Sequence, residues 1–196
     1  MIKAYKNFWS LNTDEAVVTG ILRGETAKNI EVLMPINAQM KGIDLVLMNV
    51  ESKKTISIQV KGSKAYEPKK MESDEFGDGS GGWFFLHEDV IQKATADYFI
   101  FLIYVIEQSM KTGRRYLEPH TITIPAKEIS ELSIKHKTLH EAKGGGRYSY
   151  YLWVNPRKKE AFDFREKNQG HLYDLSEYLD KKGFEKINNE LKKRNK

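Results

Sequence analysis

The chain contains no cysteine and only five prolines among its 196 residues. Without cysteine, the protein has no disulfide, no thiolate metal site and no cysteine nucleophile. Long apolar runs are also lacking, because the longest, at residues 98–106, falls well short of the ~18 residues that a membrane-spanning helix needs. Residues 1–5 lead into no apolar segment typical of a signal peptide. We therefore expect a cytoplasmic protein that does not enter a membrane.

The remaining composition is that of an ordinary globular protein, with 40% hydrophobic and 30% charged residues. A length of 196 residues suits one α/β domain with a full core. We divide it into a core over residues 1–160 and a helical C-terminal appendage of the same domain over residues 161–196. The net charge of +5 is compatible with a polyanionic partner but does not require one.

Two apolar runs, at residues 42–47 and 55–61, are rich in branched aliphatic side chains and predict β-strands. The polar residues 51–54 between them predict a hairpin loop. With a loop centred near Ser52 and Lys53, antiparallel pairing brings Asp44 opposite or diagonal to Lys61. One face of the hairpin then carries Asp44, Gln59 and Lys61.

These three side chains suit metal-assisted chemistry on a phosphodiester. Asp44 offers a hard oxygen ligand to Mg²⁺, and the Gln59 amide and the Val60 carbonyl offer neutral oxygens. Lys61 would orient a water molecule and offset the charge that develops in the transition state. The alternative is a solvated edge hairpin on which Asp44 and Lys61 form a cross-strand ion pair.

The segments Ile43-Asp44, Gln59-Val60-Lys61 and Gly62-Ser63 resemble the core motif of the PD-(D/E)XK nuclease superfamily, in its QxK variant. The resemblance implies a restriction-endonuclease-like αβββαβ core, in which helices flank a mixed central β-sheet, followed by C-terminal helices. It further implies a metal-dependent DNA endonuclease, a hydrolase that uses Mg²⁺ or Mn²⁺. Many nucleases that cut duplexes act as dimers, so a homodimer is compatible with the resemblance.

Residues 12–15 predict the start of a helix, with Asn12 as the N-cap and Glu15 three positions later. Glu15 has two alternative roles, which are to cap its own helix or to contribute to the site. The resemblance favours the second role, because many members of the superfamily place a Glu in the first helix with a Leu two turns later, and Glu15 and Leu22 match that pattern.

The expected site residues fall into three overlapping groups. The catalytic group is Asp44, Gln59, Lys61 and Glu15, and the metal ligands are Asp44, Gln59, Val60 and Glu15. The expected DNA contacts are Lys41, Ser63, Lys64, Arg114 and Arg115.

Two other function classes remain open. Gln59 replaces an acidic residue of the motif, and losing a carboxylate weakens the attraction for a divalent cation. The chain is therefore also compatible with an inactive nuclease-fold module that binds nucleic acid without cutting it. The third class is a protein-interaction domain with no nucleic-acid role.

The rest of the chain gives coarser expectations. Residues 62–82, rich in glycine and charge, predict a long irregular and mobile segment. Trp83 after it predicts a core side chain. Residues 98–106 predict a buried central strand.

Overall fold

A computed structural model of the chain describes residues 13–35, 42–141, 144–167, 170 and 172–192. Lys41 and Asn12 lie outside the described residues. The elements in chain order are α1 (Thr13–Glu25), β1 (Ile30–Leu33), β2 (Leu45–Asn49), β3 (Thr55–Gly62), α2 (Lys70–Phe76), β4 (Ser80–His87), α3 (Glu88–Gln92), β5 (Tyr98–Gln108), β6 (Arg115–Pro125), α4 (Ala126–His136), β7 (Arg147–Asn155), β8 (Glu160–Asp163), β9 (Tyr173–Asp174), the 3-10 helix η2 (Ser176–Tyr178) and α5 (Lys181–Lys192).

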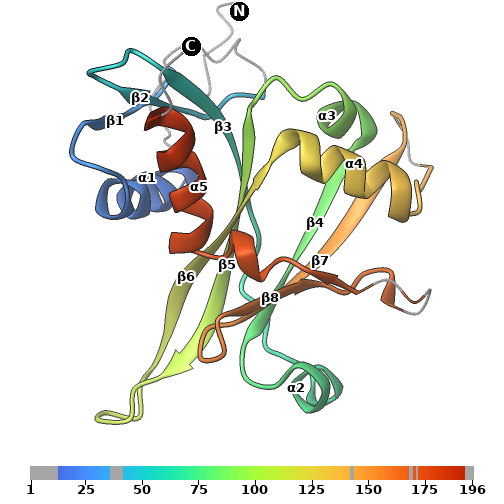
Figure 1. The fold of residues 1–196 in the computed structure, drawn as a ribbon. Helices are drawn as coiled ribbons and strands as arrows, with labels where there is room; N and C mark the ends of the chain where they lie inside the picture. The colour runs from blue at the N-terminus through green and yellow to red at the C-terminus, as the bar shows by residue number, and fades with distance from the viewer. Residues whose placement is uncertain (1–12, 36–41, 142–143, 168–169, 171, 193–196) are drawn as a thin grey trace, which may run out of the picture.

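The strands form two sheets, and the predicted α/β class is confirmed (Figure 1). The first sheet has the order β1-β2-β3-β5-β6, in which only the β3–β5 pair is parallel. The second sheet has the order β4-β7-β8-β9 and is antiparallel. A parallel pair needs a crossover connection. Here α2, β4 and α3 make that connection, and β4 pairs with β7 in the second sheet.

Strand β5 is shared by two hydrophobic cores. Tyr98, Ile100 and Leu102 pack in one core with α1 and α5, which cover the same face of the first sheet (Figure 1). Phe99 and Phe101 pack in the other core with β4, β7 and α4. Because both faces are buried, the strand has a continuous apolar run instead of an alternating one. The predicted buried strand at residues 98–106 is therefore confirmed.

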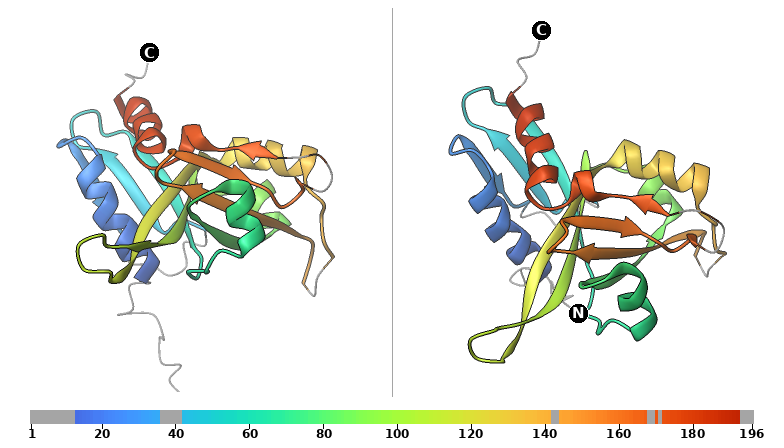
Figure 2. Two further views of the ribbon diagram at one scale, coloured as in Figure 1. Left: turned by 90° about the horizontal axis from the view of Figure 1, so that it is seen from below. Right: turned by 60° about the horizontal axis from the view of Figure 1, so that its bottom comes forward.

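The C-terminal segment from residue 161 adds to both parts of the fold. Its strands β8 and β9 extend the second sheet, whereas α5 packs on the first sheet (Figure 2). Among the described residues, no helix combines the length and the apolar character needed to cross a membrane.

The prediction of an irregular segment at residues 62–82 was wrong, because α2 and the start of β4 lie within it. The Phe76 ring of α2 packs on Phe164 at 4.5 Å between ring centroids. The glycines were misleading, because they permit close packing within a strand. A Cβ atom on Gly82 would lie only 3.0 Å from the Ile103 side chain, and one on Gly81 would lie 3.0 Å from the Tyr151 ring.

Gly183, in the first turn of α5, is buried and allows the helix to lie against β6. A Cβ atom at this position would overlap the Tyr178 carbonyl oxygen and lie 2.7 Å from the Thr123 Cβ. We expect Gly183→Ala to lower the free energy of unfolding by about 1–3 kcal/mol, as overpacking does. The matched control is Gly20→Ala in α1, where nothing lies within 4 Å and about 1 kcal/mol of stabilisation is expected. Urea unfolding of both variants checks the prediction, and equal effects of the two substitutions would contradict it.

A buried histidine joins β6 to the turn before α5. The Nδ1–H of His120 donates to Oδ2 of Asp180 at 2.8 Å, and Oδ1 of Asp180 accepts from the Thr121 amide at 2.8 Å. Burial opposes protonation of the imidazole, but the hydrogen bond and the charge of Asp180 outweigh burial and raise the pKa of His120.

The raised pKa of His120 predicts a pH-dependent stability. The protonated ring is favoured in the folded state, so its contribution is complete below the unfolded-state pKa of about 6.5 and is lost as the pH rises through the higher folded-state pKa. We expect the free energy of unfolding of the wild type, relative to His120→Asn, to decline above about pH 6.5. Urea titrations of both proteins across this range measure the difference, and parallel pH profiles would disprove the coupling.

Candidate active site at the end of strand β3

The register of the β2–β3 hairpin sets which polar side chains meet. Leu45 lies opposite Ile58, so one further step outward places Asp44 opposite Gln59 and diagonal to Lys61. This pairing is shifted by two residues from the one that a loop centred at Ser52 and Lys53 would give. A shift of two residues leaves every side chain on its original face. Asp44, Gln59 and Lys61 therefore share one face of the hairpin.

Two hydrogen bonds hold Asp44 against β3. Its amide donates to the Ile58 carbonyl oxygen at 2.9 Å. Its carboxylate oxygen Oδ2 accepts from the Val60 amide at 2.7 Å. A carboxylate with one oxygen bound to a backbone amide has a fixed orientation, so the second oxygen is also fixed in space. Asp44 is thus a partly buried acid in a defined position.

Lys61 is partly buried beside two carboxylates. Burial lowers its pKa below the ordinary lysine value, while the negative charges of Asp44 and Glu15 act in the opposite direction. A partly dehydrated ammonium group interacts more strongly with its neighbours than one in bulk water. The charges of Asp44 and Glu15 thus both act on Lys61, although Glu15 and Lys61 are 46 positions apart in the chain.

Helix α1 reaches the site through its first turn. The Asp14 carboxylate packs directly on the backbone of Gly62, and a Cβ atom there would overlap it. The Tyr104 hydroxyl donates to Asp14 Oδ1 at 3.4 Å. These contacts hold the first turn of α1, which also contains Glu15, against the end of β3. The contact of Asp14 with β3 was not predicted, although Asp14 is next to Glu15 in the predicted first turn.

Gln59 and Val60 complete the β3 part of the site. The Gln59 side chain is buried, and its Nε2 lies 3.8 Å from the place that a Cβ of Gly42 would occupy. The Val60 side chain is buried in the core under α1 and α5. Val60 lies opposite Ile100 of β5. Gln59 is therefore a buried amide on the Asp44 side of the sheet, as a neutral oxygen ligand would need to be.

The donor set contains two carboxylates, from Asp44 and Glu15, and the oxygens of Gln59 and Val60. Within the part of the chain that the structure describes, no cluster of three or more His, Asp or Glu side chains is arranged to hold a metal ion. Mg²⁺ commonly takes one or two carboxylates from a protein and keeps several waters. The residues present fit such a weakly charged magnesium site, and they do not form an all-carboxylate cage.

The expected DNA contacts are dispersed. Lys64, two residues after the end of β3, is exposed. Ser63 is buried, and its Oγ accepts from the Trp83 amide at 3.0 Å. Arg114 and Arg115 lie at the far end of the β5–β6 hairpin (Figure 1). Arg115 pairs with Gln108 of β5, whereas Lys61 pairs with Phe101 of the same strand. The seven residues between these two positions correspond to about 23 Å along the strand.

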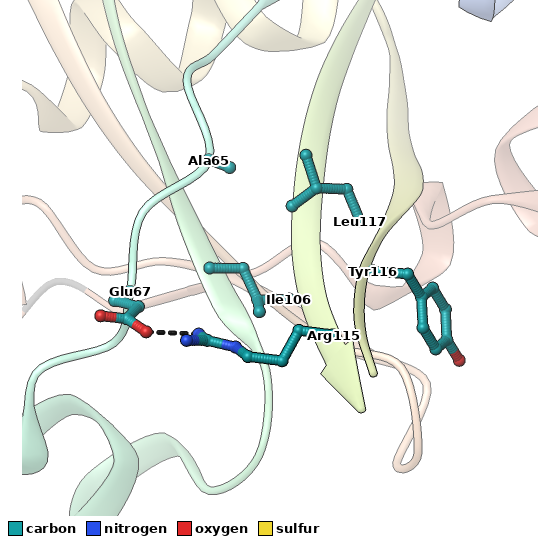
Figure 3. A pocket seen from close by; sticks show the side chains of 6 residues that line it. All are labelled: Ala65, Glu67, Ile106, Arg115, Tyr116 and Leu117. Atoms are coloured by element: carbon teal, nitrogen blue, oxygen red, sulfur yellow. Dashed lines mark hydrogen bonds and ion pairs between the residues drawn. The ribbon is translucent and has the colours of Figure 1, made fainter. Parts of the chain in front are cut away.

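Arg115 is already engaged in an ion pair with Glu67 (Figure 3). The two side chains border a surface pocket of about 470 Å³ that Ile106 and Leu117 also line. The structure thus does not bring Arg114 and Arg115 to the site of Asp44 and Lys61.

The prediction that Trp83 is a core residue was wrong, because its side chain is 39% exposed. The alternation in β4 explains the error. Phe84 and Leu86 point into the core, whereas Trp83 and Phe85 point to the opposite, open face of the second sheet. A run of four apolar residues does not reveal which two face outward.

Comparison with protein-family models, with curated proteins and with solved structures finds no match to this chain.

Proposed function

We propose that this protein is a magnesium-dependent deoxyribonuclease that hydrolyses phosphodiester bonds in the cytoplasm. The observation that supports the proposal is the Asp44 carboxylate held against β3 by the Val60 amide, together with a partly buried Lys61 on which the charges of Asp44 and Glu15 act. The element order supports it: α1, β1, β2 and β3 are followed, after a crossover, by the parallel neighbour β5. This is the αβββαβ order that the resemblance to PD-(D/E)XK nucleases implies. The absence of cysteine is consistent with a reducing compartment.

Each residue has a defined part in this proposal. Asp44, Glu15, Gln59 and the Val60 carbonyl would hold the cation, which supplies Lewis acidity and activates a bound water. The Val60 amide fixes the Asp44 carboxylate in its orientation. Lys61 orients the attacking water and offsets the negative charge that develops on the phosphoryl oxygens. Because Lys61 is partly buried, its charge is less screened than that of a surface lysine.

The proposal is tested by incubating the protein with supercoiled, linear and branched DNA in Mg²⁺ or Mn²⁺, and in EDTA. Cutting that requires the metal supports a nuclease, and the preferred DNA form identifies the substrate. No cutting of any substrate in either metal would refute the activity.

Gln59 favours a second candidate, an inactive module that binds DNA through the same fold. The amide removes one negative charge from the metal site. Gln59→Glu discriminates between the two candidates because it restores that charge at a buried position of the same size. A wild type that binds DNA without cutting it, with cutting gained in Gln59→Glu, would establish the inactive module.

A further inference from the structure

An aromatic groove runs along the edge of β4, next to the candidate site. It has a volume of about 480 Å³. The residues that line it are Gly62, Ser63, Lys64, Tyr66, Trp83 and Phe85. Gly62 directly follows Lys61 in β3, so the groove begins one residue from the proposed catalytic lysine. A ligand strand in the groove would therefore extend to the site.

Two stacked aromatic rings line the groove. Trp83 and Phe85 project from the same face of β4 with ring centroids 5.7 Å apart and an angle of 14° between the ring planes. The Phe85 side chain is 60% exposed. Two neighbouring, nearly parallel and exposed rings are an unusual surface for a protein to present to water.

The surroundings hold this surface in place. Tyr151 of β7 contacts Trp83 at 4.9 Å between ring centroids. The Trp83 amide donates to Ser63 Oγ, and Ser80 Oγ donates to the Tyr66 carbonyl oxygen at 2.7 Å. The segment after β3 is thus bound to the edge of β4. The rings are positioned before any ligand arrives, so binding costs little conformational entropy.

Positive charge borders the aromatic surface. The Arg165 guanidinium carbon lies 5.7 Å from the centre of the Trp83 ring, and its Nε donates to Ser149 Oγ at 2.9 Å. Lys64 lines the groove itself and is exposed. Exposed aromatic rings flanked by cations match the two faces of a single nucleic-acid strand, its bases and its phosphates. A purely apolar partner would have no use for the two charges.

We propose that this aromatic groove binds an unpaired DNA strand, with bases stacked on Trp83 and Phe85 and phosphates near Lys64 and Arg165. The bases of a duplex are stacked on one another and present only their edges, so the rings select single-stranded or locally opened DNA. This inference rests on the proposed nuclease function and defines its substrate, which is a single strand or a junction between single and double strands. The groove leads that strand to Lys61.

The test is fluorescence anisotropy with labelled oligo-thymidylate, an abasic strand with the same backbone and an A·T duplex, all in EDTA so that nothing is cut. We expect oligo-thymidylate to bind more tightly than the other two. Phe85→Ala and Trp83→Ala should each weaken its binding about 5- to 150-fold, the range for loss of one stacked base. Phe85→Tyr keeps the ring and should bind as the wild type does.

The matched control is Tyr116→Ala, which removes an exposed aromatic ring (49% exposed) from β6, outside the groove. It should leave binding unchanged. Equal binding of the abasic strand, wild-type affinity in both aromatic variants, or no binding of any DNA would overturn the proposal. The last result would leave a protein partner as the occupant of the groove.

The cleavage assay separates this inference from the proposed function. Stacking-dependent binding without any cutting would retain the groove and refute the nuclease. Metal-dependent cutting that is insensitive to Phe85→Ala and Trp83→Ala on every substrate would retain the nuclease and refute the groove.

Discussion

Replacing Lys61 with alanine is expected to reduce metal-dependent DNA cleavage by roughly 100- to 1,000-fold, the usual cost of removing one group that stabilises transition-state charge. The side chain lies beside Asp44 and Glu15 at the end of β3 and is partly buried. Its substitution should leave DNA affinity almost unchanged, because most of that affinity comes from contacts along the backbone. Initial rates on supercoiled plasmid in Mg²⁺, together with anisotropy in EDTA, separate the two effects.

Asp44→Asn should be as inactive as Lys61→Ala, for a different reason. The amide oxygen of Asn still accepts the hydrogen bond from the Val60 amide, so the hairpin keeps its geometry. The charge that attracts the cation is lost. Calorimetric titration with Mn²⁺ should show weakened metal binding in this variant and normal metal binding in Lys61→Ala.

Exposed residues provide the controls for this series. Lys127 and Asp89 are 86% and 77% exposed and lie outside the site. Lys127→Ala and Asp89→Asn should cut DNA at the wild-type rate. Full activity in Lys61→Ala would show that this lysine has no catalytic part.

Loss of Lys137 is expected to lower the free energy of unfolding by about 3–5 kcal/mol, because it leaves a buried charge without its partner. Its Nζ lies 2.5 Å from Asp163 Oδ2, and both side chains are only 1% exposed. The ammonium group also donates to the Ser149 carbonyl oxygen at 3.0 Å and lies 4.5 Å from the centre of the Tyr150 ring. This pair connects the end of α4 to β8 within the second core.

The test compares Lys137→Met alone with Lys137→Met combined with Asp163→Asn. Asn at position 163 keeps the Oδ1 acceptor for the amides of Tyr151 and Arg165, and it removes the unpaired charge. The single variant should melt roughly 6–20 °C below the wild type, since each kcal/mol shifts the midpoint of a domain of this size by about 2–4 °C. The double variant should recover a large part of that loss. A double variant less stable than the single one would mean that the unpaired charge is not what destabilises the protein.

The sequence allowed the α/β class and the buried β5 to be predicted because each has a local signal. The continuous apolar run at residues 98–106 is such a signal. The common face of Asp44, Gln59 and Lys61 could be predicted despite a two-residue difference in register. A side chain moves to the other face only when the register shifts by an odd number of residues. The roles of these residues stay predictions that the cleavage series addresses.

Other features depended on contacts between distant segments. Gly81 and Gly82 were interpreted as loop residues, yet the space they provide is needed by Tyr151 and Ile103. Which side chains of β4 are exposed depends on which face of β4 packs against β5. The crossover connection between β3 and β5 determines that face. The Lys137–Asp163 pair joins residues 26 positions apart that carry no common motif. No local pattern encodes such a pairing.

The sharing of β5 between the two cores has a consequence for cooperativity. Losing either core would expose one apolar face of the same strand, so neither half keeps a complete interior when the other melts. The two sheets should therefore unfold in a single transition, with the amides of β5 among the last to exchange with solvent. Strain introduced near α4 would then be felt at β5, the strand that pairs with Lys61.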